Sequence, residues 1–229
     1  MRIPFTTTAS KRPVFRKVII TSGPTQEPID PVRFISNRSS GKTGFHLAME
    51  AKKRGIERVV FITGPTFFLP TGVELIQVET AQEMQAAILE HFTAAEVLIM
   101  AAAVSDYRSA GCFPEKLKKN NEKISLELVK NPDILLELGR RKEKNQILVG
   151  FAAETSNIMA NAGKKLLDKK LDLLVLNEIS PRNPAFGNEE NEVYLLRAAG
   201  IKKIEKTGKA QIAALIWDEI FGLAAHDPD

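Results

Sequence analysis

Cysteine, tryptophan, tyrosine and histidine are scarce in this chain of 229 residues, which holds one Cys, one Trp, two Tyr and three His. The single cysteine, Cys112, excludes an internal disulfide framework and is compatible with a reducing compartment. The histidines lie far apart and have no cysteine or histidine partner at metal-ligand spacing. A structural metal site is therefore not expected, and no residue is identified as a metal ligand.

Long apolar runs are also missing. No run approaches the roughly 18 residues that a membrane-spanning helix needs, and the first residues lack the apolar core of a secretory signal. The formal net charge is only +4, which is weaker than the concentrated positive field of a nucleic-acid binder. We therefore expect a cytoplasmic protein with an anionic small ligand, and neither a membrane nor a nucleic acid as partner.

The first sixteen residues differ in composition from the rest. They contain arginine, lysine, serine and threonine but no acidic residue. We expect residues 1–16 to be a flexible N-terminal extension, although a transit peptide has the same composition. Residues 17–229 are long enough for one α/β domain, and a hydrophobic content of 44% suits a globular core.

Short β-branched runs alternate with helical patterns from residue 17 onward. The runs predict buried strands at 18–21, 59–63, 75–78, 97–101, 147–151 and 173–176. The segments between them predict helices at 43–54, 81–92, 133–142 and 156–170. This order is typical of an α/β fold of the Rossmann-like, doubly wound type, with a mostly parallel sheet. Loops that follow the strands would then meet at one crevice.

Two segments interrupt this alternation. A lysine-rich, mobile loop at 115–123 is predicted to lead into a strand at 124–129. Residues 192–197 and 201–204 predict a small β-hairpin ahead of a final helix at 209–223.

A polar loop at 32–44, between a predicted strand and a predicted helix, is the strongest candidate for anion binding. Backbone N–H groups at a helix N-terminus favour a phosphate, and Ser39, Ser40 and Lys42 would add donors and charge. An ordinary N-capped loop explains the same composition, so this motif alone does not establish that the loop binds an anion.

Charged side chains at other positions have two interpretations each. Asp106 follows a run of small residues that would let a flat ring approach closely, but it also suits a turn or a cap. Lys165 and Lys169 share one helix face, which is either solvated or matched to a triphosphate. The lysine-rich loop is either a solvated face or a flap over bound phosphates.

The segment 129–135 reads as a strand end followed by a helix start. Asn131 is expected to cap this helix, with Pro132 in its first turn. A helix N-terminus that faces the crevice could also receive part of a nucleotide. Phe151, the last residue of a predicted strand, either fills the core or stacks on a base.

Taken together in their order, these motifs resemble phosphopantothenoylcysteine synthetase, and the resemblance covers about 17–223. The motifs are SGPT at 22–25, IDPVRFISN at 29–37, SSGK at 39–42, AAVSDY at 102–107, EK at 115–116, KNPDI at 130–134 and GFAAET at 150–155. Many separate motifs in one order are far more specific than any single loop. The resemblance implies one synthetase domain over 17–229.

The resemblance implies a ligase of coenzyme A biosynthesis. The carboxylate of 4′-phosphopantothenate would attack the α-phosphorus of a nucleoside triphosphate, releasing pyrophosphate. The amine of L-cysteine would then open the acyl-nucleotide, giving 4′-phosphopantothenoylcysteine and the nucleoside monophosphate. Bacterial members use CTP and animal members ATP. The bacterial-looking run at 36–42 favours CTP and an acyl-cytidylate, and ATP remains the alternative.

The resemblance also implies roles for single residues. Asn37 is expected to contact the activated acyl group as an oxyanion donor, and Lys116 to offset charge as pyrophosphate departs. The positions that match nucleotide-binding residues are Ala102, Ala103, Asp106, Lys116, Pro132, Asp133, Ile134, Leu135, Phe151, Lys165 and Lys169. The phosphate and phosphopantothenate pocket is expected to include Gly23, Ser39, Ser40, Gly41 and Lys42. Mg²⁺ is expected with the triphosphate.

Family members are dimers whose sites can borrow residues from the partner chain. We therefore expect a homodimer, with the small hairpin extension used in dimerisation. Many bacterial members are fused behind a flavin-dependent decarboxylase. No flavin domain is recognisable here, so the stand-alone form without flavin is expected.

Other classes of function account for fewer of these features. Gly41-Lys42-Thr43 mimics the end of a P-loop, but Ser36 occupies the position of the required glycine, which leaves a P-loop-like NTPase as a more distant alternative. A dinucleotide-dependent reductase would need a G-x-G-x-x-G motif after the first strand, and there is none. A non-enzymatic basic binding module is disfavoured because aromatic residues do not interleave with the lysines.

Overall fold

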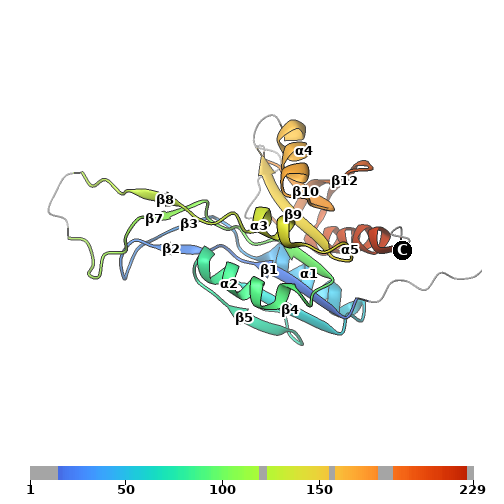
Figure 1. The fold of residues 1–229 in the computed structure, drawn as a ribbon, viewed down its shortest axis with the longest axis horizontal. Coiled ribbons are helices and arrows are strands. Elements are labelled where there is room, and N and C mark those ends of the chain that lie inside the picture. Colours follow the sequence, from blue (N-terminus) through green and yellow to red (C-terminus); the bar gives the residue numbers. More distant parts are fainter. Residues whose placement is uncertain (1–14, 119–122, 155–157, 180–187, 226–229) are drawn as a thin grey trace, which may run out of the picture.

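The structure is a computed structural model that describes residues 15–118, 123–154, 158–179 and 188–225. Most of the predicted N-terminal extension, the centre of the lysine-rich loop and the start of the fourth predicted helix lie outside these residues. Figure 1 shows a body of sheet and helices, from which two thin hairpins project side by side. We call this projection the arm; it comprises residues 26–36 and the described part of 107–130.

The central sheet has the order β12-β11-β10-β9-β6-β1-β4-β5. Six neighbouring strands are parallel, namely β5 (Glu74–Gln77), β4 (Arg58–Thr63), β1 (Lys17–Ser22), β6 (Val97–Met100), β9 (Ile147–Glu154) and β10 (Leu173–Glu178). The hairpin of β11 (Glu190–Arg197) and β12 (Gly200–Gly208) adds an antiparallel edge. The prediction of a doubly wound, mostly parallel sheet is therefore confirmed.

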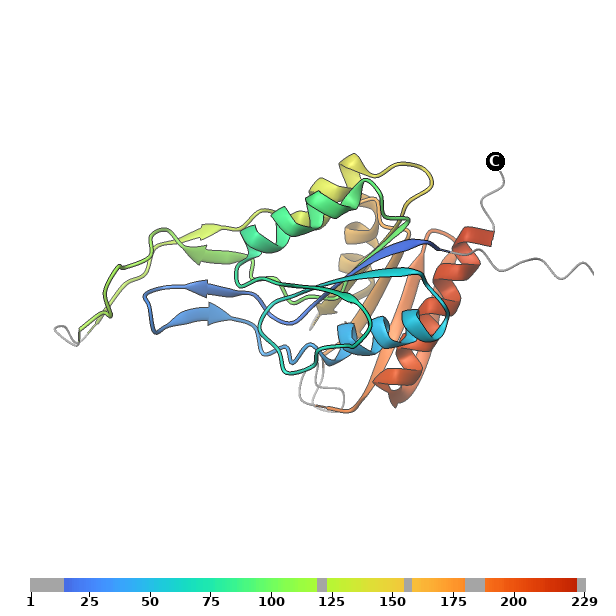
Figure 2. The same ribbon diagram turned by 90° about the horizontal axis from the view of Figure 1, so that it is seen from below.

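Helices cover both faces of this sheet. One face carries α1 (Lys42–Lys53) and α5 (Lys209–Ala225), and the other carries α2 (Ala81–Phe92), α3 (Ile134–Arg141) and α4 (Ile158–Asp168) (Figure 2). Trp217 of α5 is fully buried and donates from Nε1 to the main-chain oxygen of Leu47 at 2.9 Å. This bond and the apolar residues around it fix α5 against α1.

The prediction of a strand at 124–129 is largely wrong. The structure has only β8 (Leu128–Lys130), paired antiparallel with β7 (Tyr107–Ser109). Ile124 and Leu126 are exposed by 53% and 37%, because this part of the chain runs along the arm and has no sheet to pack against. Their alternating apolar pattern therefore does not mark a core strand here.

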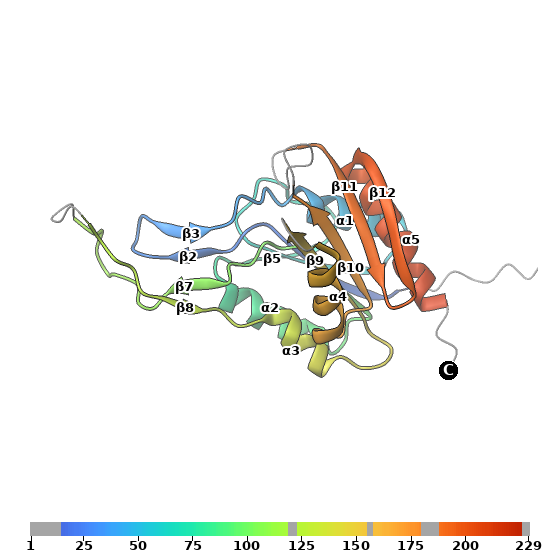
Figure 3. The same ribbon diagram turned by 90° about the horizontal axis from the view of Figure 1, so that it is seen from above.

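The sequence also did not predict the first hairpin of the arm. It consists of β2 (Gln26–Pro28) paired with β3 (Phe34–Ser36), strands too short for a periodic pattern. The two hairpins are joined beside the turn of the first one, where the amide of Phe113 donates to the main-chain oxygen of Ile29 at 2.9 Å. Figure 3 shows them leaving the body together, whereas the hairpin predicted at 192–204 lies in the sheet as β11 and β12.

The strand order reverses at β1, which lies between β4 and β6. The segments that follow β1 and β6 are tied together, since the amide of Ala103 donates to the oxygen of Gly23 at 2.9 Å and that of Thr25 to the oxygen of Ala103 at 3.2 Å. In doubly wound sheets, ligands bind at such a reversal, outside the carboxyl ends of the strands. Within the described part of the chain, no helix is long and apolar enough to cross a membrane.

Candidate active site

Two adjoining cavities open at the carboxyl ends of the strands. The α1 cavity, of about 340 Å³, is lined from the N-terminus of α1, and the α3 cavity, of about 450 Å³, from the N-terminus of α3. They share a wall made by Ala102, Val104, Asp106, Phe151 and Lys165. Two ligands, one in each cavity, would therefore meet at this wall.

The N-terminus of α1 offers backbone donors to the α1 cavity. Gly41 caps the helix in the left-handed conformation, with φ of 80°, and no side chain bonds to the first turn. Gly44 lies so close to β1 that an added Cβ would be 2.4 Å from Oγ of Ser22. The hydroxyl of Ser22 in turn donates to the oxygen of Gly41 at 2.9 Å. These contacts fix the first turn with its N–H groups available for an anion.

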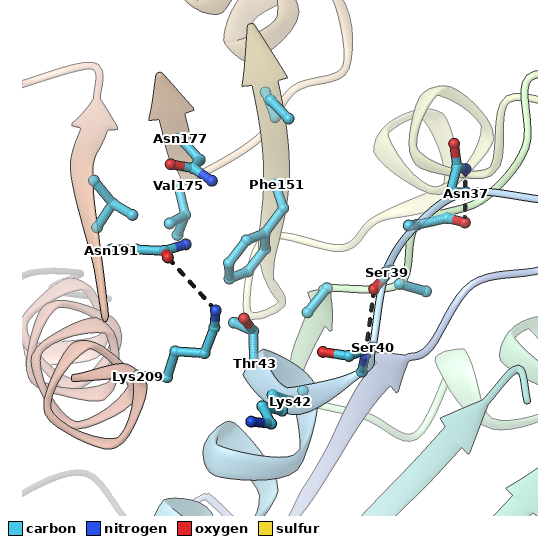
Figure 4. A pocket seen from close by; sticks show the side chains of 18 of the residues that line it. Asn37, Ser39, Ser40, Lys42, Thr43, Phe151, Val175, Asn177, Asn191 and Lys209 are labelled. Atoms are coloured by element: carbon cyan, nitrogen blue, oxygen red, sulfur yellow. Dashed lines mark hydrogen bonds between the residues drawn. The ribbon is translucent and has the colours of Figure 1, made fainter. Parts of the chain in front are cut away.

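Asn37 lies at one end of the α1 cavity. Its Nδ2 donates to the main-chain oxygen of Ala103 at 3.0 Å, which fixes the side chain while leaving a second N–H. Ser39 and Ser40 line the same cavity between Asn37 and α1 (Figure 4). The predicted cluster of Asn37, Ser39, Ser40, Gly41 and Lys42 is therefore brought together in one cavity.

Several residues at the opposite end of the α1 cavity were missed by sequence reasoning. The predicted Phe151 points into the cavity there, and the missed residues Lys209, Asn191 and Asn177 lie beyond it (Figure 4). Asn177 directly follows a predicted strand, and this position at a strand end is the feature that could have identified it. Lys209 is the first residue of a helix and Asn191 lies in the antiparallel strand β11, so nothing in the sequence linked them to a site.

Lys42 lines the α1 cavity, but its ammonium already has partners. It forms an ion pair with Glu189 and lies 5.0 Å from the centre of the Phe68 ring. The ammonium holds the pKa of Glu189 below its usual value. The pKa of nearby His46 is lowered, chiefly because the imidazole is partly buried.

The N-terminus of α3 lines the α3 cavity through Pro132, Asp133, Ile134 and Leu135. The prediction that Asn131 caps this helix is wrong, because Asp133 is the N-cap and accepts from the amide of Leu136 at 3.1 Å. Asn131 instead donates from Nδ2 to the main-chain oxygen of Ser105 at 2.9 Å. It thereby ties α3 to the loop that carries Asp106.

Lys165 of α4 and Lys169, which follows the end of this helix at Asp168, both line the α3 cavity. Lys165 pairs with Glu154 at 2.6 Å and Lys169 pairs with Asp133 at 2.8 Å. Anionic groups of a ligand would therefore share these ammonium groups with carboxylates. The two lysines are thus not the free charges that the match to a triphosphate assumed.

Two predicted site residues lie outside the cavity walls. Gly23 lines neither cavity, but its main-chain oxygen holds Ala103, which lines one of them. Lys116 is exposed on the arm, next to Leu117, whose amide donates to the Asp30 carboxylate at 3.1 Å. The structure of one chain therefore does not bring Lys116 to the other predicted residues.

Among the described residues, no group of three or more His, Cys, Asp or Glu side chains could hold a metal ion. Asp106 is the carboxylate that lines both cavities. Mg²⁺ commonly binds through one or two carboxylates together with substrate phosphates. The residues present therefore fit a metal that arrives with a nucleotide better than one held by the protein alone.

Comparison with known proteins gives close relatives. Residues 14–223 match the family described as the DNA/pantothenate metabolism flavoprotein C-terminal domain. The chain is 42% identical over 201 residues to the Coenzyme A biosynthesis bifunctional protein CoaBC of Borreliella burgdorferi, a match that covers 86% of this chain and 50% of that protein. The chain thus spans about half the length of the curated relatives it matches.

Solved structures have the same fold. The crystal structure of the C-terminal domain of CoaBC matches with a TM-score of 0.78 and 36% identity, covering 93% of this chain and 97% of that one. A Cab2 mutant in complex with phosphopantothenate-cysteine matches with a TM-score of 0.72 and 17% identity, covering 92% of this chain and 86% of that one. At this lower identity the likeness shows the fold alone.

Proposed function

The chain belongs to the family of the DNA/pantothenate metabolism flavoprotein C-terminal domain, and from this premise we propose that it is a phosphopantothenate–cysteine ligase. The observation that carries the proposal is the pair of cavities with a common wall, each lined by a helix N-terminus. A ligase that activates a carboxylate with a nucleotide needs two anionic ligands to meet at one place. The names of the CoaBC relatives support coenzyme A biosynthesis as the pathway.

The nucleotide is assigned to the α3 cavity, with CTP preferred and ATP as the alternative. Its walls carry Pro132 to Leu135, Lys165 and Lys169, and Phe151 offers a ring face for stacking. The α-phosphate would lie at the common wall, near Asp106. Mg²⁺ bound to the phosphates would offset the charge that develops on pyrophosphate as it leaves.

The acyl substrate is assigned to the α1 cavity, with its carboxylate at the common wall. The carboxylate oxygen attacks the α-phosphorus, and the bond from this phosphorus to the pyrophosphate oxygen breaks. The amine of cysteine then attacks the acyl carbon, the nucleoside monophosphate leaves, and the amine loses a proton. The free N–H of Asn37 would stabilise the oxyanion formed on the acyl oxygen during this second step.

A homodimer is the assembly that we propose, and the arm supports it. Large apolar side chains are exposed along both of its hairpins: Val32 by 58%, Phe34 by 49%, Tyr107 by 46%, Phe113 by 42%, Ile124 by 53% and Leu128 by 46%. An extended surface of this kind is typical of a surface that another chain covers. A second copy would bury it and could bring Lys116 of one chain to the cavities of the other.

The test measures pyrophosphate and nucleoside monophosphate released from 4′-phosphopantothenate, Mg²⁺ and either CTP or ATP, with and without cysteine. We expect turnover to the monophosphate that depends on cysteine, with a higher kcat/KM for CTP. Higher kcat/KM for ATP would correct the nucleotide and keep the ligase. Failure of the folded protein with both nucleotides would overturn the proposed function.

A further inference from the structure

Lys209 is a buried cation at the inner end of the α1 cavity, opposite Asn37 (Figure 4). Only 7% of the residue is exposed. Its Nζ donates to the main-chain oxygen of Asn188 at 2.6 Å and lies 3.5 Å from Oδ1 of Asn191. Both acceptors are neutral, and none of the described carboxylates forms an ion pair with this ammonium.

The surroundings of Lys209 make its charge costly. It is the first residue of α5, where the helix dipole already places positive potential, and the first turn of α1 lines the same cavity. Burial lowers the pKa of the ammonium more than Glu189 raises it. The Glu189 side chain is itself 73% exposed and paired with Lys42. An anion in the cavity would offset this excess of positive potential.

The chemistry of the walls around Lys209 suits a phosphate. The hydroxyl of Thr43 and the side chain of Ser40 line the cavity beside the open first turn of α1, and Asn191 adds an amide. The two neutral oxygens leave the third N–H of Lys209 unused. A phosphate could accept hydrogen bonds from this N–H and from the backbone N–H groups of α1. Charge-assisted bonds of this kind are about twice as strong as neutral ones.

We propose that Lys209, with Thr43 and Asn191, forms a phosphate-binding subsite at the inner end of the α1 cavity. The inference deepens the proposed function, on which it rests. A terminal phosphate there belongs either to the acyl substrate, as its 4′-phosphate, or to the nucleotide, as the part released as pyrophosphate. The subsite would thus determine how one of the two substrates is oriented relative to the common wall.

The direct test is binding of pyrophosphate and of inorganic phosphate, measured by isothermal titration calorimetry on the full chain without other substrates. We expect Lys209→Gln to weaken binding about tenfold or more, because a charged hydrogen bond is lost. Lys206→Gln is the matched control, since Lys206 is exposed three residues earlier and the change in net charge is the same. Equal binding by wild type, Lys209→Gln and Lys206→Gln, or no binding by wild type, would overturn the subsite.

Kinetic arms distinguish the two sources of the phosphate. If the 4′-phosphate binds at Lys209, Lys209→Gln loses the preference for phosphopantothenate over pantothenate and keeps the KM for CTP. If the nucleotide phosphates bind there, the KM for CTP and the Ki of pyrophosphate rise instead. Retention of all three values would overturn the inference, even where the ligase activity itself is established.

A substitution at a buried position can prevent folding, so Thr43→Val provides a second variant. It removes one hydroxyl from the opposite wall and leaves Lys209 in place. We expect a loss of pyrophosphate affinity of several-fold with an unchanged thermal midpoint. Wild-type affinity in this variant, together with an unfolded Lys209→Gln, would count against the subsite.

Discussion

Asn37 is the residue on which the proposed chemistry depends most directly. Its side chain is exposed, and its one described side-chain bond is to the oxygen of Ala103. This bond orients the amide without burying it, so the residue contributes little to stability. Such a side chain is free to act on a reacting group. Its removal should lower the catalytic rate and leave the stability of the fold nearly unchanged.

We predict that Asn37→Ala slows formation of the amide about 10²–10³-fold, which is typical of a lost oxyanion donor. Nucleotide activation should persist, so the acyl-nucleotide accumulates and is measured by rapid quench and chromatography. Asn37→Asp is the control, because it keeps the shape but lacks the N–H groups. Normal amide formation by either variant would remove the Asn37 donor from the mechanism.

The first turn of α1 is the element on which the α1 cavity depends. Its position follows from the close approach of Gly44 to β1 and from the bond that Ser22 makes to Gly41. The helix carries no side-chain cap, so its N–H groups remain open to the cavity. Packing at one glycine therefore positions the backbone donors that would bind an anion.

We predict that Gly44→Ala destabilises the protein by about 1–3 kcal/mol, because the added methyl overpacks against Ser22. The free energy of unfolding is measured in urea. Gly163→Ala in α4 is the matched control, since no atom lies within 4 Å of its added Cβ. The control should be neutral or stabilising by up to about 1 kcal/mol. Equal stability of the two variants would contradict this account of α1.

Asp30 is the residue that links the two hairpins of the arm, at the turn between β2 and β3. Its buried carboxylate accepts from the amides of Val32 and Arg33 at 2.9 Å and of Leu117 at 3.1 Å, and it pairs with the Arg33 guanidinium. The guanidinium is the main reason that the pKa of Asp30 lies well below its usual range. Both hairpins of the arm thus meet at one ionised side chain.

We predict that Asp30→Asn loosens the arm, seen as faster hydrogen exchange at Val32 and Leu117. Because the folded pKa is depressed, the stabilisation by Asp30 is fully present above about pH 4, the usual value for an aspartate, and is lost as the pH falls below it. Urea unfolding of wild type and Asp30→Asn should therefore differ at pH 7 and converge in acid. A difference that does not depend on pH would contradict an ionised Asp30.

At the scale of the whole molecule, two residues that the proposed reaction needs at one site lie apart within a single chain. Asn37 lines the cavity, whereas Lys116 lies on the arm. The arm exposes apolar side chains that a second copy would cover. The proposed homodimer therefore predicts a composite site, with the cavities of one chain and Lys116 of its partner.

Mixed dimers test this arrangement. Asn37→Ala and Lys116→Ala should each be nearly inactive as pure homodimers. After the two are unfolded and refolded together in equal amounts, half of the chains pair as mixed dimers, each with one intact composite site. About a quarter of the wild-type activity should then return. No recovery, in samples that sedimentation shows to be dimeric, would mean that Lys116 does not act across the dimer.

Sequence alone determined the doubly wound sheet, most element positions and the family, because β-branched runs and helical periodicity report local burial and because ordered motifs are specific. Helix 81–92 coincides with α2, whose N-terminal end is marked by the capping box of Thr80 and Glu83. The match over residues 14–223 confirms the family that the motifs indicated. These features could be predicted because each depends on residues that are close together in the chain.

Only the tertiary structure decided which side chains share a cavity. Asn191 and Lys209 reach the α1 cavity because β11 and α5 pack beside β10 and α1, and no local pattern marks such contacts. The arm was not predicted either, because strands of three residues are too short to show a periodic pattern. Its apolar residues also have the alternating pattern that is typical of a core strand. Contacts between segments distant in sequence depend on the assembled fold, and they placed Lys116 away from the cavities of its own chain.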